Sequence, residues 1–237
     1  LSAQQEFENT KDNKYKKLIS RYNNIQMARK ISLNSAYGAI GNQYFRYYDK
    51  AIAEGITKSG QLSIRWIENR LNKYLNNILK TDDDYVIASD TDSVYLTLDK
   101  LVTKTIKSDN ALSKTINFLD KVASESIEPY ITKSYDELKQ YTNAFANKMF
   151  MKREVIADKG IWVAKKRYIL NVWNSEGVSY KEPKLKMMGI EAVKSSTPAI
   201  CRQKIKDALE LIMTSDEKEL NKFVINFREE FLKVKPE

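Results

Sequence analysis

Residues 85–98 of the chain read Tyr-Val-Ile-Ala-Ser-Asp-Thr-Asp-Ser-Val-Tyr-Leu-Thr-Leu, two β-prone runs that meet at a pair of aspartates. Val, Ile, Tyr and Leu favour strands, and the short polar centre favours the turn of a hairpin. We therefore expect Asp90 and Asp92 close together at a hairpin tip. Like charges in proximity oppose ionisation unless a cation joins them, and oxygen ligands of this kind suit Mg²⁺ or Mn²⁺. A solvated surface turn is the alternative, because Asp and Ser are common turn formers.

The composition limits the chemistry that the chain can perform. Its 237 residues, 42% of them hydrophobic, can build one large domain or two small ones. The chain has no histidine, which removes the commonest general base and any catalytic triad that uses imidazole. Carboxylates, metals, Lys or Tyr must therefore carry any chemistry. The net charge of +9 indicates an anionic partner, with nucleic acid ahead of a membrane surface.

Cellular location and completeness are also suggested by the sequence. The single cysteine, Cys201, excludes an internal disulfide and fits a reducing compartment. No apolar run approaches the roughly 20 residues of a membrane span, and the first residues carry no signal-peptide pattern. We therefore expect a soluble, intracellular protein. The sequence begins at Leu1 rather than Met and ends on Lys-Pro-Glu after a charged helical pattern, so we expect a fragment or a subunit of something longer.

The first part of the chain is predicted to be helical. Apolar residues recur at spacings of three and four over residues 13–40 and again over 51–79. In the first helix, Lys30, Asn34 and Tyr37 share one face, and Gly38 either ends the helix or lets a partner approach its backbone. A cation, an amide and an aromatic ring together suit a nucleotide. An ordinary solvated face, with Gly38 as a C-cap, is the alternative.

The second part changes from helices to strands and back. The pattern predicts helices over residues 111–126 and 128–143, strands over 149–157, 161–173 and 178–188, a turn at 174–177, and helices over 198–213 and 216–234. Lys165, Lys166 and Arg167 are predicted to lie within the middle strand, where consecutive cations face both sides and favour an anionic partner. A charged edge strand is the alternative. Ser196 or Thr197 is predicted to cap the helix that begins at Pro198.

Three motifs stand in one order, and together they resemble the family B DNA polymerases, most closely the replicative enzymes of large tailed, T4-like bacteriophages. The motifs are Lys30-x-x-x-Asn34-Ser35-x-Tyr37-Gly38, which resembles the fingers motif, Asp90-Thr91-Asp92-Ser93, which resembles the catalytic palm motif, and Lys165-Lys166-Arg167-Tyr168, which resembles the motif for the DNA minor groove. The resemblance covers nearly the whole chain. It implies an α+β fold: a palm with an antiparallel sheet flanked by helices, a long fingers helix and the start of a helical thumb.

The resemblance also implies domain boundaries and residue roles. Residues 1–42 would be the C-terminal half of the fingers, 43–189 the palm, and 190–237 the base of the thumb. By this resemblance, Lys30 and Asn34 would hold the triphosphate, while Tyr37 and Gly38 would line the pocket of the nascent base pair. Asp92 would be the principal metal ligand, with Asp90 as its partner nearer the primer end. The residues that would contact the DNA duplex are Lys165, Lys166, Arg167 and Tyr168, and Lys194 would contact the DNA backbone.

The implied activity is template-directed DNA synthesis with two Mg²⁺ or Mn²⁺ ions, primer–template DNA and dNTPs, in the cytoplasm of an infected bacterium. Further implied partners are an upstream polymerase half, in the same or a separate chain, and a sliding clamp that binds a C-terminal segment beyond this sequence. The family's other aspartate motif, Asp-x-x-Ser-Leu-Tyr-Pro, does not occur here, so we expect no synthesis by this chain alone. Ala88-Ser89 also replaces the usual Tyr-Gly before the aspartates.

Two other classes of protein are weighed against a polymerase. A non-catalytic DNA-binding module would keep the basic surface without the chemistry, but it would have no need of adjacent carboxylates facing DNA phosphates. A reverse transcriptase or RNA polymerase also uses palm aspartates, and the family B type of helix motif argues against it.

Overall fold

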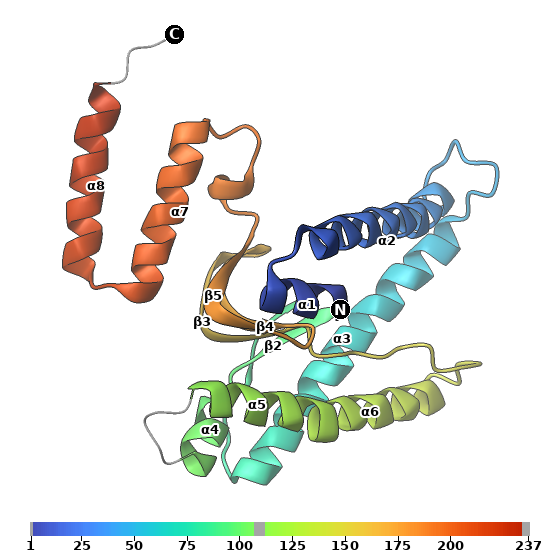
Figure 1. Cartoon of the computed structure of the whole chain (residues 1–237). Coiled ribbons are helices and arrows are strands. Elements are labelled where there is room, and N and C mark those ends of the chain that lie inside the picture. Colours follow the sequence, from blue (N-terminus) through green and yellow to red (C-terminus); the bar gives the residue numbers. More distant parts are fainter. Residues whose placement is uncertain (1, 107–111, 234–237) are drawn as a thin grey trace. The chain divides into compact units, whose positions relative to one another are not determined.

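The computed structural model describes residues 2–106 and 112–233, and these form two compact units (Figure 1). The first unit takes in the described residues up to Glu154 together with Glu176–Val178, and the second takes in Val155–Ser175 and the described residues from Ser179 onward. Helices alternate with two small sheets, so the predicted α+β class is confirmed. The boundaries that we predict for fingers, palm and thumb follow the motifs rather than these units, and they stay a prediction.

The first unit begins with three helices. After α1 (Ser2–Thr10) come α2 (Asn13–Ile40) and α3 (Lys50–Leu79), which confirm the two long helices predicted from periodicity. An aspartate caps each of the long ones, since Asp12 accepts a hydrogen bond from the backbone of Lys14, and Asp49 accepts one from Ile52. No residue of α2 is buried.

Of the two roles considered for Gly38, that of a C-cap is wrong, whereas the predicted helix over residues 13–40 is confirmed. The helix continues to Ile40, and Gly41 is the C-cap, with its backbone N–H directed at the carbonyl oxygens of Tyr37 and Ala39. Two glycines three residues apart both fit a C-cap pattern, and only the hydrogen bonds distinguish them. A Cβ at position 38 would meet nothing within 4 Å, so the backbone there is open to a partner.

The core of the first unit is built on α3. Every fourth residue of its second half is buried: Ser63, Ile67, Leu71, Leu75 and Leu79. Ile67 and Leu71 pack with Val86 and with Ile127, Ile131, Tyr135 and Leu138 of the following helices. The Trp66 indole N–H also donates to the Ser134 carbonyl oxygen at 2.9 Å. This stripe therefore holds α3 against α6, and the two helices cross in Figure 1.

The helices after the hairpin differ in detail from the prediction. A short α4 (Asp99–Thr105) was not predicted, and its Lys104 donates to the Leu79 carbonyl oxygen at the end of α3, at 2.6 Å. The two predicted helices are α5 (Leu112–Val122) and α6 (Glu128–Tyr141), joined by a π-helical turn, η1 (Ala123–Ile127). Pro129 lies in the first turn of α6, where a proline is tolerated. The predicted start at residue 111 lies outside the described residues.

The strands form two separate sheets. The predicted hairpin is confirmed as β1 (Val86–Asp90) paired antiparallel with β2 (Ser93–Leu96), and this pair is a sheet of its own. The second unit contains β3 (Val155–Ala164), β4 (Arg167–Ser175) and β5 (Val178–Met188), with β4 in the centre. The turn between β4 and β5 contains Glu176 and Gly177, both with positive φ, as a tight two-residue hairpin requires.

The basic run was placed wrongly by the strand pattern. Lys165 and Lys166 form the turn between β3 and β4, where Ala164 pairs with Arg167, so they do not lie within a strand. The alternative of a charged edge strand is wrong as well, because Arg167 opens the central strand. Lys166 takes φ 61°, a left-handed conformation that costs a non-glycine residue on the order of 1 kcal/mol. No glycine or asparagine marks this turn, which is why the residue pattern did not reveal it.

The second unit ends with helices that pack on its sheet. Ile169 of β4 is buried with Ile190, Ala192 and Met213, which belong to the segment around the 3₁₀ turn η2 (Glu191–Val193) and to α7 (Ala199–Thr214). The predicted cap by Ser196 or Thr197 is wrong: Pro198 is the N-cap, and no side chain bonds the helix start. Asp216 caps α8 (Glu217–Leu232) by accepting from the Glu219 N–H. None of the described helices is long and apolar enough to cross a membrane.

Replacing Leu71 with Ala should lower the free energy of unfolding by about 2–5 kcal/mol, because the side chain is fully buried and its removal leaves a cavity. Urea unfolding followed by circular dichroism measures the change. Leu33→Ala is the matched control, since Leu33 is 74% exposed and its truncation should change stability by no more than about 0.5 kcal/mol. Equal effects at the two positions would contradict the assignment of the core to α3.

Candidate functional site

The tip of the β1–β2 hairpin brings the two predicted aspartates into one turn. Asp90 is the last residue of β1 and pairs with Ser93, so Thr91 and Asp92 form a two-residue loop. The Asp90 carbonyl oxygen accepts from the Asp92 N–H at 2.6 Å and from the Ser93 hydroxyl at 3.1 Å. The Thr91 hydroxyl donates to Asp90 Oδ1 at 3.0 Å. Backbone and side chains thus fix the turn, with Asp90 partly exposed and Asp92 exposed.

Ser89 fits this hairpin without strain. As a residue of β1 it pairs with Val94 of β2, and its φ is not positive. The residue with positive φ is Thr91, at 51°. A glycine is therefore not required at position 89, and the register shift in the β1–β2 pairing lies before this residue, between Val86 and Ala88.

The hairpin is attached to α3 by two asparagines one helical turn apart. Asn72 Oδ1 accepts from the backbone N–H groups of Tyr85 at 2.8 Å and Val86 at 3.1 Å. The side chain of Asn76 bonds both backbone polar groups of Asp83: it accepts from the Asp83 N–H and donates to the Asp83 carbonyl oxygen. These bonds satisfy the backbone at the start of β1, so they set where the strand begins and, four and six residues further on, where Asp90 and Asp92 lie.

An ion pair closes the same loop. The Lys100 ammonium donates to Asp83 Oδ2 at 2.5 Å, and the Tyr85 and Thr81 hydroxyls bond each other at 2.6 Å. The hydrogen bond from Lys100 lowers the pKa of Asp83 below its usual range, and the same bond raises the pKa of Lys100. The loop ahead of the hairpin is therefore held by charge as well as by amide hydrogen bonds.

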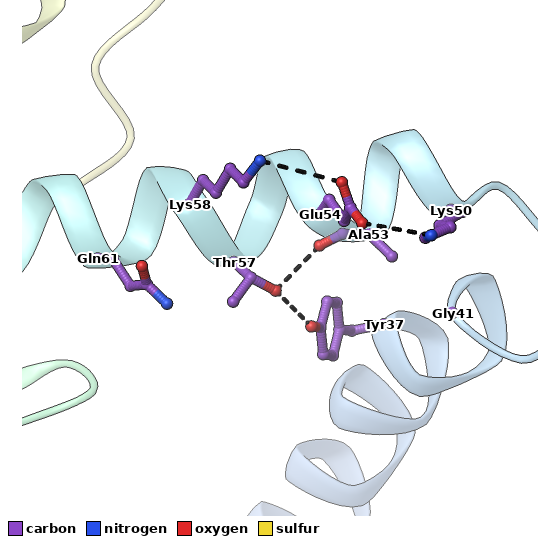
Figure 2. Close-up of a pocket in the computed structure, with 8 residues that line it drawn as sticks. All are labelled: Tyr37, Gly41, Lys50, Ala53, Glu54, Thr57, Lys58 and Gln61. Atoms are coloured by element: carbon purple, nitrogen blue, oxygen red, sulfur yellow. Dashed lines mark hydrogen bonds and ion pairs between the residues drawn. The ribbon is translucent and has the colours of Figure 1, made fainter.

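The predicted nucleotide-binding residues share α2. Lys30, Asn34, Tyr37 and Gly38 are all exposed. Figure 2 shows Tyr37 directed at α3, where its hydroxyl and that of Thr57 are 2.7 Å apart, and Thr57 in turn donates to the Ala53 carbonyl oxygen at 3.0 Å. The ring of Tyr37 is thus fixed by the neighbouring helix.

An open pocket of about 440 Å³ lies between the end of α2 and the start of α3 (Figure 2). Its wall is charged, because Glu54 lies 3.7 Å from the ammonium of Lys50 and 4.0 Å from that of Lys58. Tyr37 and Gly41 form the α2 side of the wall. Of the predicted nucleotide-binding residues, Tyr37 is the member that lines this pocket.

The predicted DNA-binding residues lie in the second unit. Lys165 and Lys166 are exposed in the β3–β4 turn, whereas Tyr168 is only 7% exposed and lies beside Trp162. Arg167 and Lys194 are brought together by a residue that the sequence did not single out: both donate to the carboxylate of Glu191. A hydrogen bond from its own backbone N–H is the main cause that lowers the pKa of Glu191, and the neighbouring Lys194 and Arg167 lower it further.

The donor atoms at the hairpin tip suit a hard divalent cation. Carboxylate oxygens are the ligands that Mg²⁺ and Mn²⁺ prefer, and Asp90 and Asp92 supply them from one turn. Within residues 2–106 and 112–233, no three His, Cys, Asp or Glu side chains are grouped as a metal site. The hairpin therefore provides part of an octahedral shell and not all of it.

The exposed face of α2, the acidic hairpin and the basic turn before β4 stand in the same chain order as the three motifs that resemble family B DNA polymerases. The family model for DNA polymerase family B matches residues 2–236, and the chain belongs to this family.

The chain is similar to two phage enzymes, each named DNA-directed DNA polymerase. It is 43% identical to that of Escherichia phage RB69 over 202 residues, 81% of this chain and 22% of the relative, and 39% identical to that of Enterobacteria phage T4 over 222 residues, 88% of this chain and 24% of the relative. A DNA polymerase of Choristoneura biennis entomopoxvirus is 24% identical over 166 residues, 57% of this chain and 17% of the relative. The chain thus spans about a quarter of the length of the phage relatives that it matches.

Asp83→Asn should destabilise the first unit near neutral pH and have little effect in acid. Because the pKa of Asp83 is lowered in the folded state, its ion pair contributes stability above about pH 4, the ordinary range of an aspartate, and that stability disappears as the pH falls through the folded pKa. Urea unfolding at pH 7, 5 and 3 measures the difference from the wild type.

The control for this series is Asp82→Asn, at the exposed neighbouring position. Its effect on the free energy of unfolding should vary less with pH. A difference between Asp83→Asn and the wild type that stays constant from pH 7 to pH 3 would show that the loop is not held by this ion pair.

Proposed function

We propose that this chain forms part of the catalytic core of a DNA-dependent DNA polymerase and acts in template-directed synthesis by two-metal nucleotidyl transfer. The hairpin turn that presents Asp90 and Asp92 together is the observation that supports this proposal most. Phosphoryl transfer depends on positioning and charge neutralisation more than on a covalent catalyst, which suits a chain without histidine.

Asp92 is proposed as the principal metal ligand, and Asp90 as its partner nearer the primer end. Two Mg²⁺ ions, or Mn²⁺, would supply activation of the primer hydroxyl and neutralisation of the triphosphate charge when bound. The chain's own contribution is to hold the carboxylates in place: Asn72 and Asn76 fix the start of β1, and the hydrogen bonds of Thr91 and Ser93 fix the turn.

The exposed face of α2 is proposed to bind the incoming nucleotide. Lys30 would neutralise phosphate charge, and Asn34 would hydrogen-bond the triphosphate. Tyr37, held by Thr57, would present a fixed ring edge to the nascent base pair, and the open backbone at Gly38 would let the base pair approach closely. A tyrosine fixed before the substrate arrives loses little conformational freedom on binding, which favours selection by shape.

Primer–template DNA is the proposed partner of the second unit. Lys165 and Lys166 extend from a turn, where both side chains are exposed, and a turn can enter a groove more easily than the middle of a sheet. The upstream polymerase half, a sliding clamp and the cytoplasm of the infected host complete the proposal, and the family membership supports them.

The chain of 237 residues should incorporate no nucleotide above background with primed template, dNTPs and Mg²⁺ or Mn²⁺. Two carboxylates on one hairpin leave the metal shell incomplete, and even a small misplacement of reacting groups costs on the order of a hundredfold in rate. Adding a chain that carries the family's other aspartate motif and its partner fingers helix should restore primer extension, measured by gel electrophoresis of labelled primer.

In the restored system Asp92→Ala should abolish extension, and Asp82→Ala should not, because Asp82 is an exposed aspartate ahead of the hairpin with no proposed role in catalysis. Robust extension by the isolated chain that persists in Asp92→Ala would contradict the role of Asp92. Duplex binding without restored extension would instead favour a non-catalytic DNA-binding module.

Replacing Lys165 and Lys166 together with Ala should weaken duplex binding almost equally for all sequences. The plot of log K against log salt should become shallower by about 0.9 for each phosphate that the variant no longer binds. Fluorescence anisotropy over a salt series measures both effects. The double variant Lys73→Ala/Lys80→Ala, at exposed lysines of the first unit, is the control and should keep the wild-type slope. An unchanged slope in the Lys165/Lys166 variant would show that the turn does not contact DNA.

A further inference from the structure

Glu191 links two segments that the proposed function assigns to DNA. Its carboxylate accepts from Arg167 Nη2 through both oxygens, each at 2.5 Å, and from Lys194 Nζ through Oε1 at 3.1 Å. Arg167 directly follows the basic turn, and Lys194 directly follows η2. One anion therefore lies between two cations of the proposed DNA-binding surface, and the triad carries one net positive charge.

A second contact joins the same two segments through the backbone. Gly189 has φ 63°, and a Cβ built there would lie 2.3 Å from the Lys166 carbonyl oxygen and 3.0 Å from Arg167 Cγ. Only a glycine allows so close an approach. The end of β5 thus lies directly against the basic turn, and the Glu191–Arg167 pair is built into a packed joint.

Arg167 is poorly placed to bind a phosphate. A guanidinium binds phosphate best with two parallel N–H groups, and the edge formed by Nε and Nη2 offers such a pair. Here Nη2 donates to Glu191, and Nε is buried with no hydrogen-bond partner among the described residues. That edge of the guanidinium is therefore occupied within the protein, and a phosphate would have to displace Glu191 to form two parallel hydrogen bonds with it.

Lys194 is placed differently. Its ammonium has three donors, and its contact with Glu191 at 3.1 Å is longer than those of Arg167 and involves a single oxygen. A phosphate can therefore bind the remaining donors, or displace the glutamate from this contact, without breaking the Arg167 pair.

We infer that Glu191 is a positioning residue of the DNA-binding surface: it keeps Arg167 in an internal ion pair, so that Lys194, and not Arg167, contacts a DNA phosphate. The inference rests on the proposed DNA binding and changes the role of Arg167 within it. Arg167 then anchors the Lys165–Lys166 turn to the segment after β5. Without the carboxylate, the guanidinium would lose its internal partner and would be repelled by the neighbouring Lys194 ammonium.

The salt dependence of duplex binding tests this assignment, because it counts the phosphates that the protein neutralises. The 237-residue chain and its variants are titrated with a labelled duplex of mixed sequence, by anisotropy, at a series of salt concentrations. Lys194→Ala should make the slope shallower by about 0.9, the value of one contact. The double variant Arg167→Gln/Glu191→Gln removes a neutral pair and should leave the slope unchanged.

Glu191→Gln alone should make the slope steeper by up to about 0.9, since it releases the guanidinium to bind a phosphate. Glu191→Asp keeps the charge and should keep the wild-type slope even if the unit becomes less stable. Glu182→Gln, the same charge change at an exposed position of β5, should also leave the slope unchanged. Circular dichroism at each salt concentration confirms that every variant compared is folded.

The outcomes distinguish a failure of this inference from a failure of the proposed DNA binding. A double variant whose slope falls as far as that of Lys194→Ala would show that Arg167 is itself a phosphate contact, and it would overturn the inference. So would a Glu191→Gln slope equal to that of the wild type. Failure of the wild-type chain to bind duplex DNA at low salt would overturn the proposed DNA binding and the inference with it.

Discussion

The buried stripe of α3 is the constraint on which the first unit depends. Ile67, Leu71, Leu75 and Leu79 recur every four residues and remove one side of the second half of this helix from water. Burial of apolar surface is the main term that favours folding, and the later helices and the hairpin pack against this stripe. Asn72 and Asn76 lie on the same helix, and their side chains hydrogen-bond the backbone at the start of β1, which fixes the strand to the helix.

This arrangement explains how a small hairpin can present two carboxylates. A two-stranded sheet is at best marginally stable on its own. Here Val86 is buried in the core beside Leu71, and Val94 and Leu96 pack against the same cluster, so the apolar side chains hold both strands while the polar tip stays outside. The aspartates are held in a reproducible place because the residues behind them are buried.

The second unit holds several cations close together around one carboxylate. Ile169, Ile190, Ala192 and Met213 bury the inner side of the sheet and the segment after it. At the end of β5, Gly189 allows that segment to reach the basic turn, and Glu191 places a negative charge among the cations. Burial brings the segments together, and the ion pairs set the directions of their side chains.

The sequence by itself determined the local elements and the residues of the candidate site. Periodicity predicted α2, α3 and the hairpin, since a buried stripe needs apolar residues at the period of its element, and the motifs identified Asp90, Asp92, Lys30 and Lys165 as candidates. Only the tertiary structure decided that Lys165 and Lys166 form a turn, that Gly41 rather than Gly38 caps α2, and that Asn72 and Glu191 hold the site. The physical reason is that these features depend on contacts between residues far apart in the chain. The close approach of Gly189 to Lys166 and the hydrogen bonds between residues 13 or 24 positions apart leave no periodic trace in the sequence.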